Sequence, residues 1–233
     1  LVDDPIQIPH RFNKTEDIEV AGLLTATITC GNRKSILNSM TRLLAAMGNT
    51  PYEFIINYRP ADKKHLKGFV HRTFNEVDCD AFVQVLNSIY TEQGGLRKVF
   101  VDAYNQNQSI ADSINAFRNC FVSAHIPSRT LKHTPNINAG SAAKRLNMYL
   151  RWMTRTNAEG VDFGLWTEIP TSALLIPLDV HSGRVARGLG LLLRQQNDIR
   201  AVEELTAELR QFDSNDPIKY DFALFGMGVN GEI

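Results

Sequence analysis

Two segments of the chain carry residues that could perform covalent chemistry, and the first is built around Lys144. A helix is expected from about Gly140 to Thr154, with the lysine in its first turn. A lysine attacks as a neutral amine, and the positive end of a helix dipole disfavours the protonated form. The charges of Arg145, Arg151 and Arg155 act in the same direction. Helical spacing places Lys144, Arg151 and Arg155 on one face of this helix. The alternative to a catalytic role is therefore that these residues form a basic face exposed to solvent.

The second segment runs from Ile176 to Gly190 and has Asp179 directly before a predicted helix. That helix is expected to bury Val185 and to direct Arg184 outward. The simpler alternative is that Asp179 only caps the helix by accepting hydrogen bonds from its first backbone N–H groups.

Together these segments resemble the helix-hairpin-helix superfamily of DNA glycosylases, to which endonuclease III and the 8-oxoguanine DNA glycosylases belong. That family has a Gly-rich hairpin turn leading to a nucleophilic lysine, as Gly140-Ser-Ala-Ala-Lys144 does here. Its aspartate lies in an apolar-Asp-x-His-x-x-Arg-apolar setting, which Leu178-Asp-Val-His-Ser-Gly-Arg-Val185 resembles. The predicted helices 17–30 and 32–47 look like the family's opening pair. The resemblance implies a two-lobed helical fold with a cleft between the lobes.

The chain also departs from that family's common pattern. The turn lacks the second glycine of Gly-x-Gly, and Lys144 and Asp179 are 35 residues apart, about twice the usual separation. The archaeal 8-oxoguanine glycosylases resemble the chain in having a longer insert. Endonuclease III's iron–sulfur loop has no counterpart here.

The resemblance implies that a damaged base, such as an oxidised purine, is flipped out of double-stranded DNA. Lys144 would attack C1′ of the sugar, Asp179 would supply negative charge near the oxocarbenium, and a Schiff base would allow strand nicking. No cofactor or metal is implied. The residues expected to bind nucleic acid are Lys132, Gly140, Ser141, Arg145, Arg151 and Arg184. The candidates for stacking on the base are Trp152, Phe163 and Trp166, with core aromatics as the alternative.

A second resemblance covers nearly the whole chain and is to a bacterial family of conserved proteins of unknown function. The segments that carry it are Asp17-Ile-Glu-Val-Ala-Gly22, Gly31-Asn-Arg-Lys34, Lys144-Arg-Leu-Asn-Met148 and Tyr220-Asp-Phe-Ala-Leu-Phe-Gly226.

The charge distribution is uneven although the formal net charge is zero. No Asp or Glu occurs from Ser113 to Ala158, a stretch that holds seven Lys and Arg residues, whereas acidic residues are frequent after Asp198. This pattern predicts one basic face and one acidic face, as a polyanion binder would have. The alternative is a chance run of bases on a solvated surface.

Helical periodicity dominates the chain, so the predicted class is all-α. Asn32 and Asp198 are expected to cap helices, and Asp216-Pro217 to begin the last one. We see no strand alternation and interpret residues 128–139 as a loop. The expected organisation is a single domain over 1–233, with a hairpin lobe of about 30–155 and a second lobe from the N-terminal segment plus about 160–233.

Three widely spaced cysteines, Cys30, Cys79 and Cys120, argue against a disulfide framework or a metal loop and favour a reducing cytoplasm. No window is long and apolar enough for a membrane span, and the first residues lack the features of a secretory signal. The neutral net charge favours a monomer.

Three hypotheses follow from the sequence. The first is a bifunctional DNA glycosylase and AP lyase that removes a damaged base. The second is a nucleic-acid-binding protein that keeps the fold without the chemistry, which salt-dependent binding without cleavage would identify. The third is a helical interaction protein that is unrelated to nucleic acid.

Overall fold

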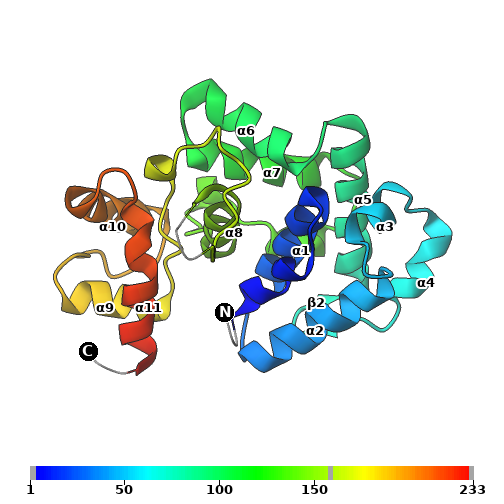
Figure 1. The fold of residues 1–233 in the computed structure, drawn as a ribbon, viewed down its shortest axis with the longest axis horizontal. Coiled ribbons are helices and arrows are strands. Elements are labelled where there is room, and N and C mark those ends of the chain that lie inside the picture. The colour runs from blue at the N-terminus through cyan, green and yellow to red at the C-terminus, as the bar shows by residue number, and fades with distance from the viewer. Residues whose placement is uncertain (1–3, 157–159, 231–233) are drawn as a thin grey trace. The chain divides into compact units, whose positions relative to one another are not determined.

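The computed structural model describes residues 4–156 and 160–230 of the 233-residue chain. These residues are mostly helical, which confirms the all-α prediction (Figure 1). The α-helices are α1 (Thr15–Ile28), α2 (Arg33–Ala46), α3 (Pro51–Ile56), α4 (Lys63–Leu66), α5 (Glu76–Glu92), α6 (Leu96–Asn107), α7 (Ile110–Ser123), α8 (Lys144–Thr154), α9 (Val180–Gly188), α10 (Ile199–Phe212) and α11 (Asp221–Asn230). The 3₁₀ helices are η1 (Pro5–Gln7), η2 (Pro9–Arg11), η3 (Pro60–Asp62), η4 (Ser128–His133), η5 (Ile137–Ala139), η6 (Thr171–Ala173) and η7 (Pro217–Tyr220).

Several predicted helix boundaries depend on caps that the structure shows. Asn32 caps α2 and Asp198 caps α10, each by accepting backbone N–H bonds with its side chain. The helix expected from Gly140 begins instead at Lys144, and the expected loop 128–139 contains η4 and η5. Asp216-Pro217 starts η7 rather than the last α-helix, which begins at Asp221.

A small antiparallel hairpin was not expected from the sequence. Strand β1 (Val70–His71) pairs with β2 (Phe74–Asn75), with Val70 opposite Asn75 and His71 opposite Phe74. Two residues per strand are too few to show an alternating pattern, so hydrophobic periodicity could not reveal it.

Contacts divide the chain into two compact units, each with its own core. The N-terminal unit contains the residues up to Ala103 together with Ala116–Thr134, and the C-terminal unit contains Tyr104–Asn115 and the chain from Pro135 onward. The chain therefore passes between the units within α6, within α7 and again between Thr134 and Pro135.

The buried carboxylate of Asp78 organises part of the N-terminal unit. It lies in the first turn of α5. Its Oδ1 accepts a hydrogen bond from the Thr130 hydroxyl at 3.0 Å, and its Oδ2 forms an ion pair with Arg129 at 3.1 Å. His133 Nε2 is 3.4 Å from the same carboxylate. A buried charge must be paired to be tolerated, so this carboxylate fixes η4 onto α5.

Helices α9 and α11 lie side by side in the C-terminal unit (Figure 1). Their approach is close because Gly228 has no side chain: a Cβ there would lie 2.9 Å from the backbone oxygen of His181. Arg184 of α9 also donates a hydrogen bond to the Gly228 carbonyl at 2.7 Å. The α11 backbone is therefore held directly against the start of α9.

We expect Gly228→Ala to destabilise the protein by about 1–3 kcal/mol, because the added methyl group forces the two helices apart. Gly226 lies on the same helix, and a Cβ there would meet nothing within 4 Å. Gly226→Ala is the matched control and should stabilise the helix by up to about 1 kcal/mol. Urea unfolding of both variants measures the difference, and equal stabilities would contradict the close packing.

Candidate active site

The first part of the site is the approach to helix α8. Gly140 follows η5 with a positive φ of 91°, and its carbonyl accepts a hydrogen bond from the Ile199 N–H at 3.2 Å. Ala143 adopts the left-handed conformation, with φ of 49°, and accepts the Asn147 N–H bond that begins the helix. Lys144 is consequently the first residue of α8.

The backbone N–H groups in the approach to α8 are largely committed to acceptors within the turn. The N–H groups of Ala139, Gly140 and Ser141 already donate to acceptors within 136–137, and the Ala143 N–H donates to Ser141 Oγ. The N–H groups that lack acceptors inside the helix belong to its first turn, from Lys144 onward.

The second part of the site is the start of helix α9, where Asp179 is the N-cap. Its Oδ1 accepts from the His181 and Ser182 N–H groups at 2.8 and 2.9 Å, and the Asp179 N–H donates to Ser182 Oγ at 3.0 Å. Asp179 therefore does cap the helix, but the capping hydrogen bonds use only one of its two carboxylate oxygens.

The structure brings the two predicted residues together. Lys144 Nζ lies 3.1 Å from Asp179 Oδ2, with the lysine side chain 32% exposed and the aspartate side chain 15% exposed. Burial works against ionisation of Asp179, but the Lys144 charge and the hydrogen bonds from Ser182 outweigh it and lower the pKa of the carboxyl. The result is an accessible amine beside a carboxylate that stays ionised.

A second carboxylate, Asp221, belongs to this electrostatic environment although sequence reasoning did not select it. It is the first residue of α11 and contacts Arg151 Nη1 through Oδ2. Burial raises the pKa of Asp221 to about 6. The positive charges of Arg151 and Lys144 act to lower this pKa, whereas the negative charge of Asp179 acts to raise it. Its position after a Pro-initiated turn, in a segment shared with a conserved family, was the only signal in the sequence.

Comparison with known proteins identifies the family. The model described as "Protein of unknown function (DUF2400)" matches residues 4–230. The chain belongs to this family. Neither the curated proteins nor the solved structures include a significant match. The range shared with the DUF2400 family contains Lys144, Asp179 and Asp221 together, so all three residues lie within the family's common region.

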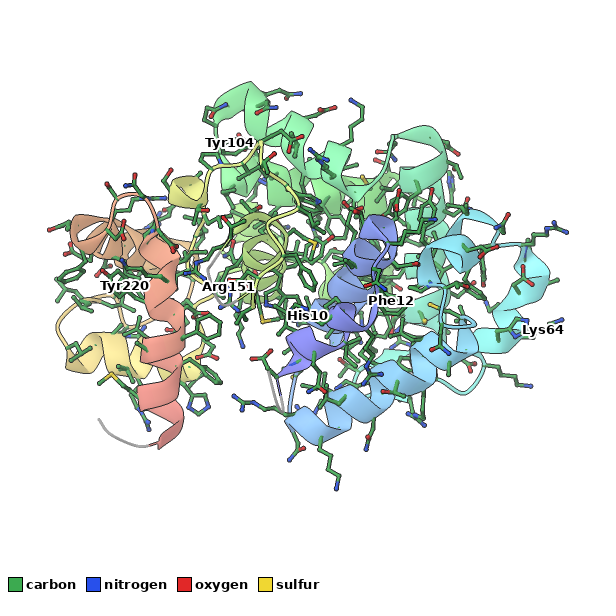
Figure 2. All side chains as sticks on the ribbon, viewed as in Figure 1. His10, Phe12, Lys64, Tyr104, Arg151 and Tyr220 are labelled. Carbon is green, nitrogen blue, oxygen red and sulfur yellow. The ribbon has the colours of Figure 1, made fainter. Side chains whose placement is uncertain are left out.

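Two of the three bases that the alternative of a solvated basic face placed on α8 are buried in the structure. Arg151 is buried and contacts both Asp162, at 3.3 Å, and Asp221, while Arg155 is buried between Asp162 and Asp216. The Arg151 side chain lies between α8 and α11, with its guanidinium 4.4 Å from the Phe222 ring centroid (Figure 2). Arg151 therefore has no exposed guanidinium with which to bind a phosphate.

Replacing Arg151 with methionine should destabilise the protein by about 3–5 kcal/mol, because Asp162 and Asp221 would each lose a buried cation. Arg194→Met is the control, since Arg194 pairs with Asp198 near the surface and should contribute much less. Urea unfolding compares the two variants. Equal losses would show that the buried network contributes no more than a surface pair.

The other predicted nucleic-acid contacts have different environments. Lys132 is exposed and lies in the N-terminal unit. Gly140, Ser141 and Arg145 are half-buried, and Arg184 is exposed but hydrogen-bonded to Gly228. Of these residues, Ser141 and Arg145 lie nearest in sequence to Lys144.

Two of the three candidates for base stacking are core residues. Trp152 and Trp166 are buried, and Trp166 packs edge-on against Tyr149 with ring centroids 5.4 Å apart. Phe163 is half-buried, and its N–H donates to the Trp152 carbonyl at 2.8 Å. The core alternative therefore holds for both tryptophans, and only Phe163 keeps accessible surface.

Across residues 4–156 and 160–230, no three His, Cys, Asp or Glu side chains are grouped so that they could hold a metal ion. The same described ranges contain no helix of the length and apolarity needed to cross a membrane.

Proposed function

We propose that this protein is a DNA glycosylase and AP lyase that acts on a damaged base through a lysine Schiff base. The observation that carries the proposal is the accessible Lys144–Asp179 pair, in which an amine and an ionised carboxylate meet at the starts of α8 and α9. The resemblance of these two segments to the helix-hairpin-helix glycosylases supports it, and with it a two-lobed fold of that type.

The proposed reaction begins when the neutral amine of Lys144 bonds to C1′ of the flipped nucleotide and the base leaves with the electrons of the glycosidic bond. The charge of Asp179 stabilises the oxocarbenium character that develops at C1′. Opening of the sugar then gives an imine between Lys144 and C1′. The imine acidifies the proton on C2′, so the 3′ phosphate can be eliminated and the strand is nicked.

Phosphate oxygens would be held by groups near the same helix start. The first-turn N–H groups of α8 and the side chains of Ser141 and Arg145 are suitable donors. Such contacts position the duplex without reading its sequence. We also propose an oxidised purine as the substrate and a reducing, cytoplasmic setting, which three free cysteines favour.

The test is borohydride trapping of the purified protein on duplexes that carry 8-oxoguanine, uracil or an abasic site, with Lys144→Ala alongside. A covalent adduct formed by the wild type and lost in the variant would support the proposal and show which lesion is accepted. Salt-dependent binding without any adduct would favour the non-catalytic nucleic-acid binder instead. Absence of both would exclude a nucleic-acid function.

A further inference from the structure

The solvent-exposed side of helix α2 carries cations and neutral polar groups but no acid. No Asp or Glu occurs in residues 20–52, which include the whole helix. Exposed helices ordinarily carry charges of both signs, as α6 does where Lys98 pairs with Asp102 one turn later. The exposed polar side chains of α2 include Lys34, Ser35, Asn38, Thr41 and Arg42.

Further cations lie beside α2 on elements that contact it. Helix α2 packs against α4 and against strand β1 (Figure 1), and residues 63–75, which contain both, have no acid either. Arg11 reaches α2 by donating to Thr41 Oγ1 at 3.0 Å, and Arg42 reaches the Val70 carbonyl of β1 at 3.5 Å. We define the α2 basic face as the exposed residues Arg11, Lys34, Arg42, Lys64, Lys67 and Arg72.

The β1–β2 hairpin fixes the position of Arg72 within this face. His71 is buried, and its ring nitrogens lie 2.9 Å from Ser39 Oγ of α2 and 3.2 Å from the Cys30 carbonyl oxygen. Arg72 has a left-handed φ of 53°, and its guanidinium lies over Gly31, where a Cβ would be 2.9 Å from Arg72 Nε. Its Nη1 also donates to Cys30 Sγ at 3.3 Å. The Arg72 guanidinium is therefore held beside the turn that leads into α2.

The charges of the α2 basic face are not neutralised by the protein itself. Within residues 4–156 and 160–230, none of its six cations forms an ion pair with a carboxylate, whereas the neighbouring Lys63 pairs with Asp80 at 2.8 Å. Lys34 lies in the first turn of α2, where the helix dipole disfavours a cation. Like charges that are left unpaired repel one another, and a bound polyanion relieves that repulsion.

The composition of the face favours a nucleic-acid backbone over other anionic surfaces. Arg and Lys, assisted by Ser, Thr and Asn, make most protein contacts to phosphate and sugar, and these are the residue types exposed on α2. A membrane surface requires a broad apolar stripe, but on α2, α4 and the hairpin Val70 is the one large apolar side chain that is exposed. Protein partners are usually anchored by aromatic residues, and here Phe69 and Phe74 are buried.

The charge balance of the two units agrees with this assignment. The N-terminal unit contains 15 Lys and Arg residues and 12 Asp and Glu residues. The C-terminal unit, which contains Lys144, has 10 Lys and Arg residues and 13 Asp and Glu residues. Because a polyanion is attracted by net positive charge, its general affinity is expected from the N-terminal unit.

We propose that the α2 basic face binds the phosphate backbone of a nucleic acid, independently of any chemistry at Lys144. Its contacts are made to phosphates and not to base edges, so binding should vary little with sequence and weaken steeply with salt.

The experiment is fluorescence anisotropy of the full-length protein with a labelled, undamaged DNA duplex over a series of KCl concentrations. Each phosphate contact contributes about 0.9 to the slope of log Kobs against log[KCl]. We therefore expect Lys34→Gln/Arg42→Gln to weaken binding and to make this slope shallower by about 1.8. Lys64→Gln/Lys67→Gln should have an effect of the same size, and it keeps the test decisive if the first variant does not fold.

Arg97→Gln/Lys98→Gln is the matched control. It removes one arginine and one lysine from α6 within the same unit, where Lys98 is already paired with Asp102. This variant should bind with the wild-type affinity and slope. Lys144→Ala should also bind the undamaged duplex as the wild type does.

The outcomes separate this inference from the proposed function. Wild-type binding by both the α2 and the α4 variants would overturn it, as would a wild type that binds neither duplex DNA nor duplex RNA at low salt. Binding to phosphatidylserine vesicles without binding to nucleic acid would overturn it in favour of a membrane surface. Loss of binding to either duplex in the variants supports it, and the duplex bound more tightly identifies the source of the backbone. Such a loss, combined with no borohydride adduct from the wild type, would contradict the proposed function alone.

Discussion

Replacing Lys144 with arginine is expected to abolish the borohydride-trapped adduct while changing the stability of the protein by less than about 1 kcal/mol. The guanidinium keeps a positive charge that can pair with Asp179, but it stays protonated and cannot form an imine. Lys144→Arg therefore separates the chemistry of the amine from the ion pair that it makes at 3.1 Å. Adduct yield on a denaturing gel and urea unfolding together measure the effect.

Lys219→Arg is the matched control for this experiment, because Lys219 is also paired with an aspartate in the C-terminal unit, but its partner is Asp213 and not Asp179. It should give the wild-type yield of adduct. If Lys144→Arg were trapped as efficiently as the wild type, another amine would be the nucleophile, and peptide mapping of the adduct would identify it.

Local signals explain which features could be predicted from the sequence. An Asn or Asp before a periodic apolar run is a cap, and Asn32, Asp198 and Asp179 all act as caps in the structure. The proximity of Lys144 and Asp179 was predicted by the resemblance of two short segments, not by periodicity. The hairpin at residues 70–75 and the start of α8 depend on backbone conformations with no clear pattern in the sequence.

The charge pattern along the chain does not translate directly into a basic surface, for a physical reason. The acid-free stretch from Ser113 to Ala158 suggested an exposed basic face, but three of its arginines meet acids that the fold supplies from elsewhere. Arg129 pairs with Asp78, and Arg155 pairs with Asp216. A run of one charge along the chain says little about a surface when distant segments carry the opposite charge to the same place.

Asp221 was missed for a related reason. In the sequence it is one acid among many near the C-terminus, and the segment that it shares with a conserved family does not assign it a role. Its properties come from burial and from Arg151, seventy residues earlier in the chain. Only the tertiary structure distinguishes it from Asp213, which pairs with Lys219 at the surface.

We expect Asp179→Asn to lower the rate of adduct formation by about 10²–10⁴-fold while the fold stays within about 1 kcal/mol of the wild type. Asparagine caps helices as well as aspartate does, because its side-chain oxygen can accept the same bonds from the His181 and Ser182 N–H groups. The substitution thus removes the charge that faces Lys144 and keeps the cap. Asp179→Ala removes both and should cost a further 0.5–2 kcal/mol or so of stability.

Asp198→Asn tests whether capping alone explains the result. Asp198 caps α10 in the same unit and pairs with Arg194, so its replacement repeats the chemical change at a site without the lysine. If Asp179 were only a cap, Asp179→Asn would form adduct as fast as the wild type, because asparagine keeps the cap. A large loss of rate in Asp179→Asn and none in Asp198→Asn would therefore assign the effect to charge stabilisation at C1′, where the oxocarbenium develops.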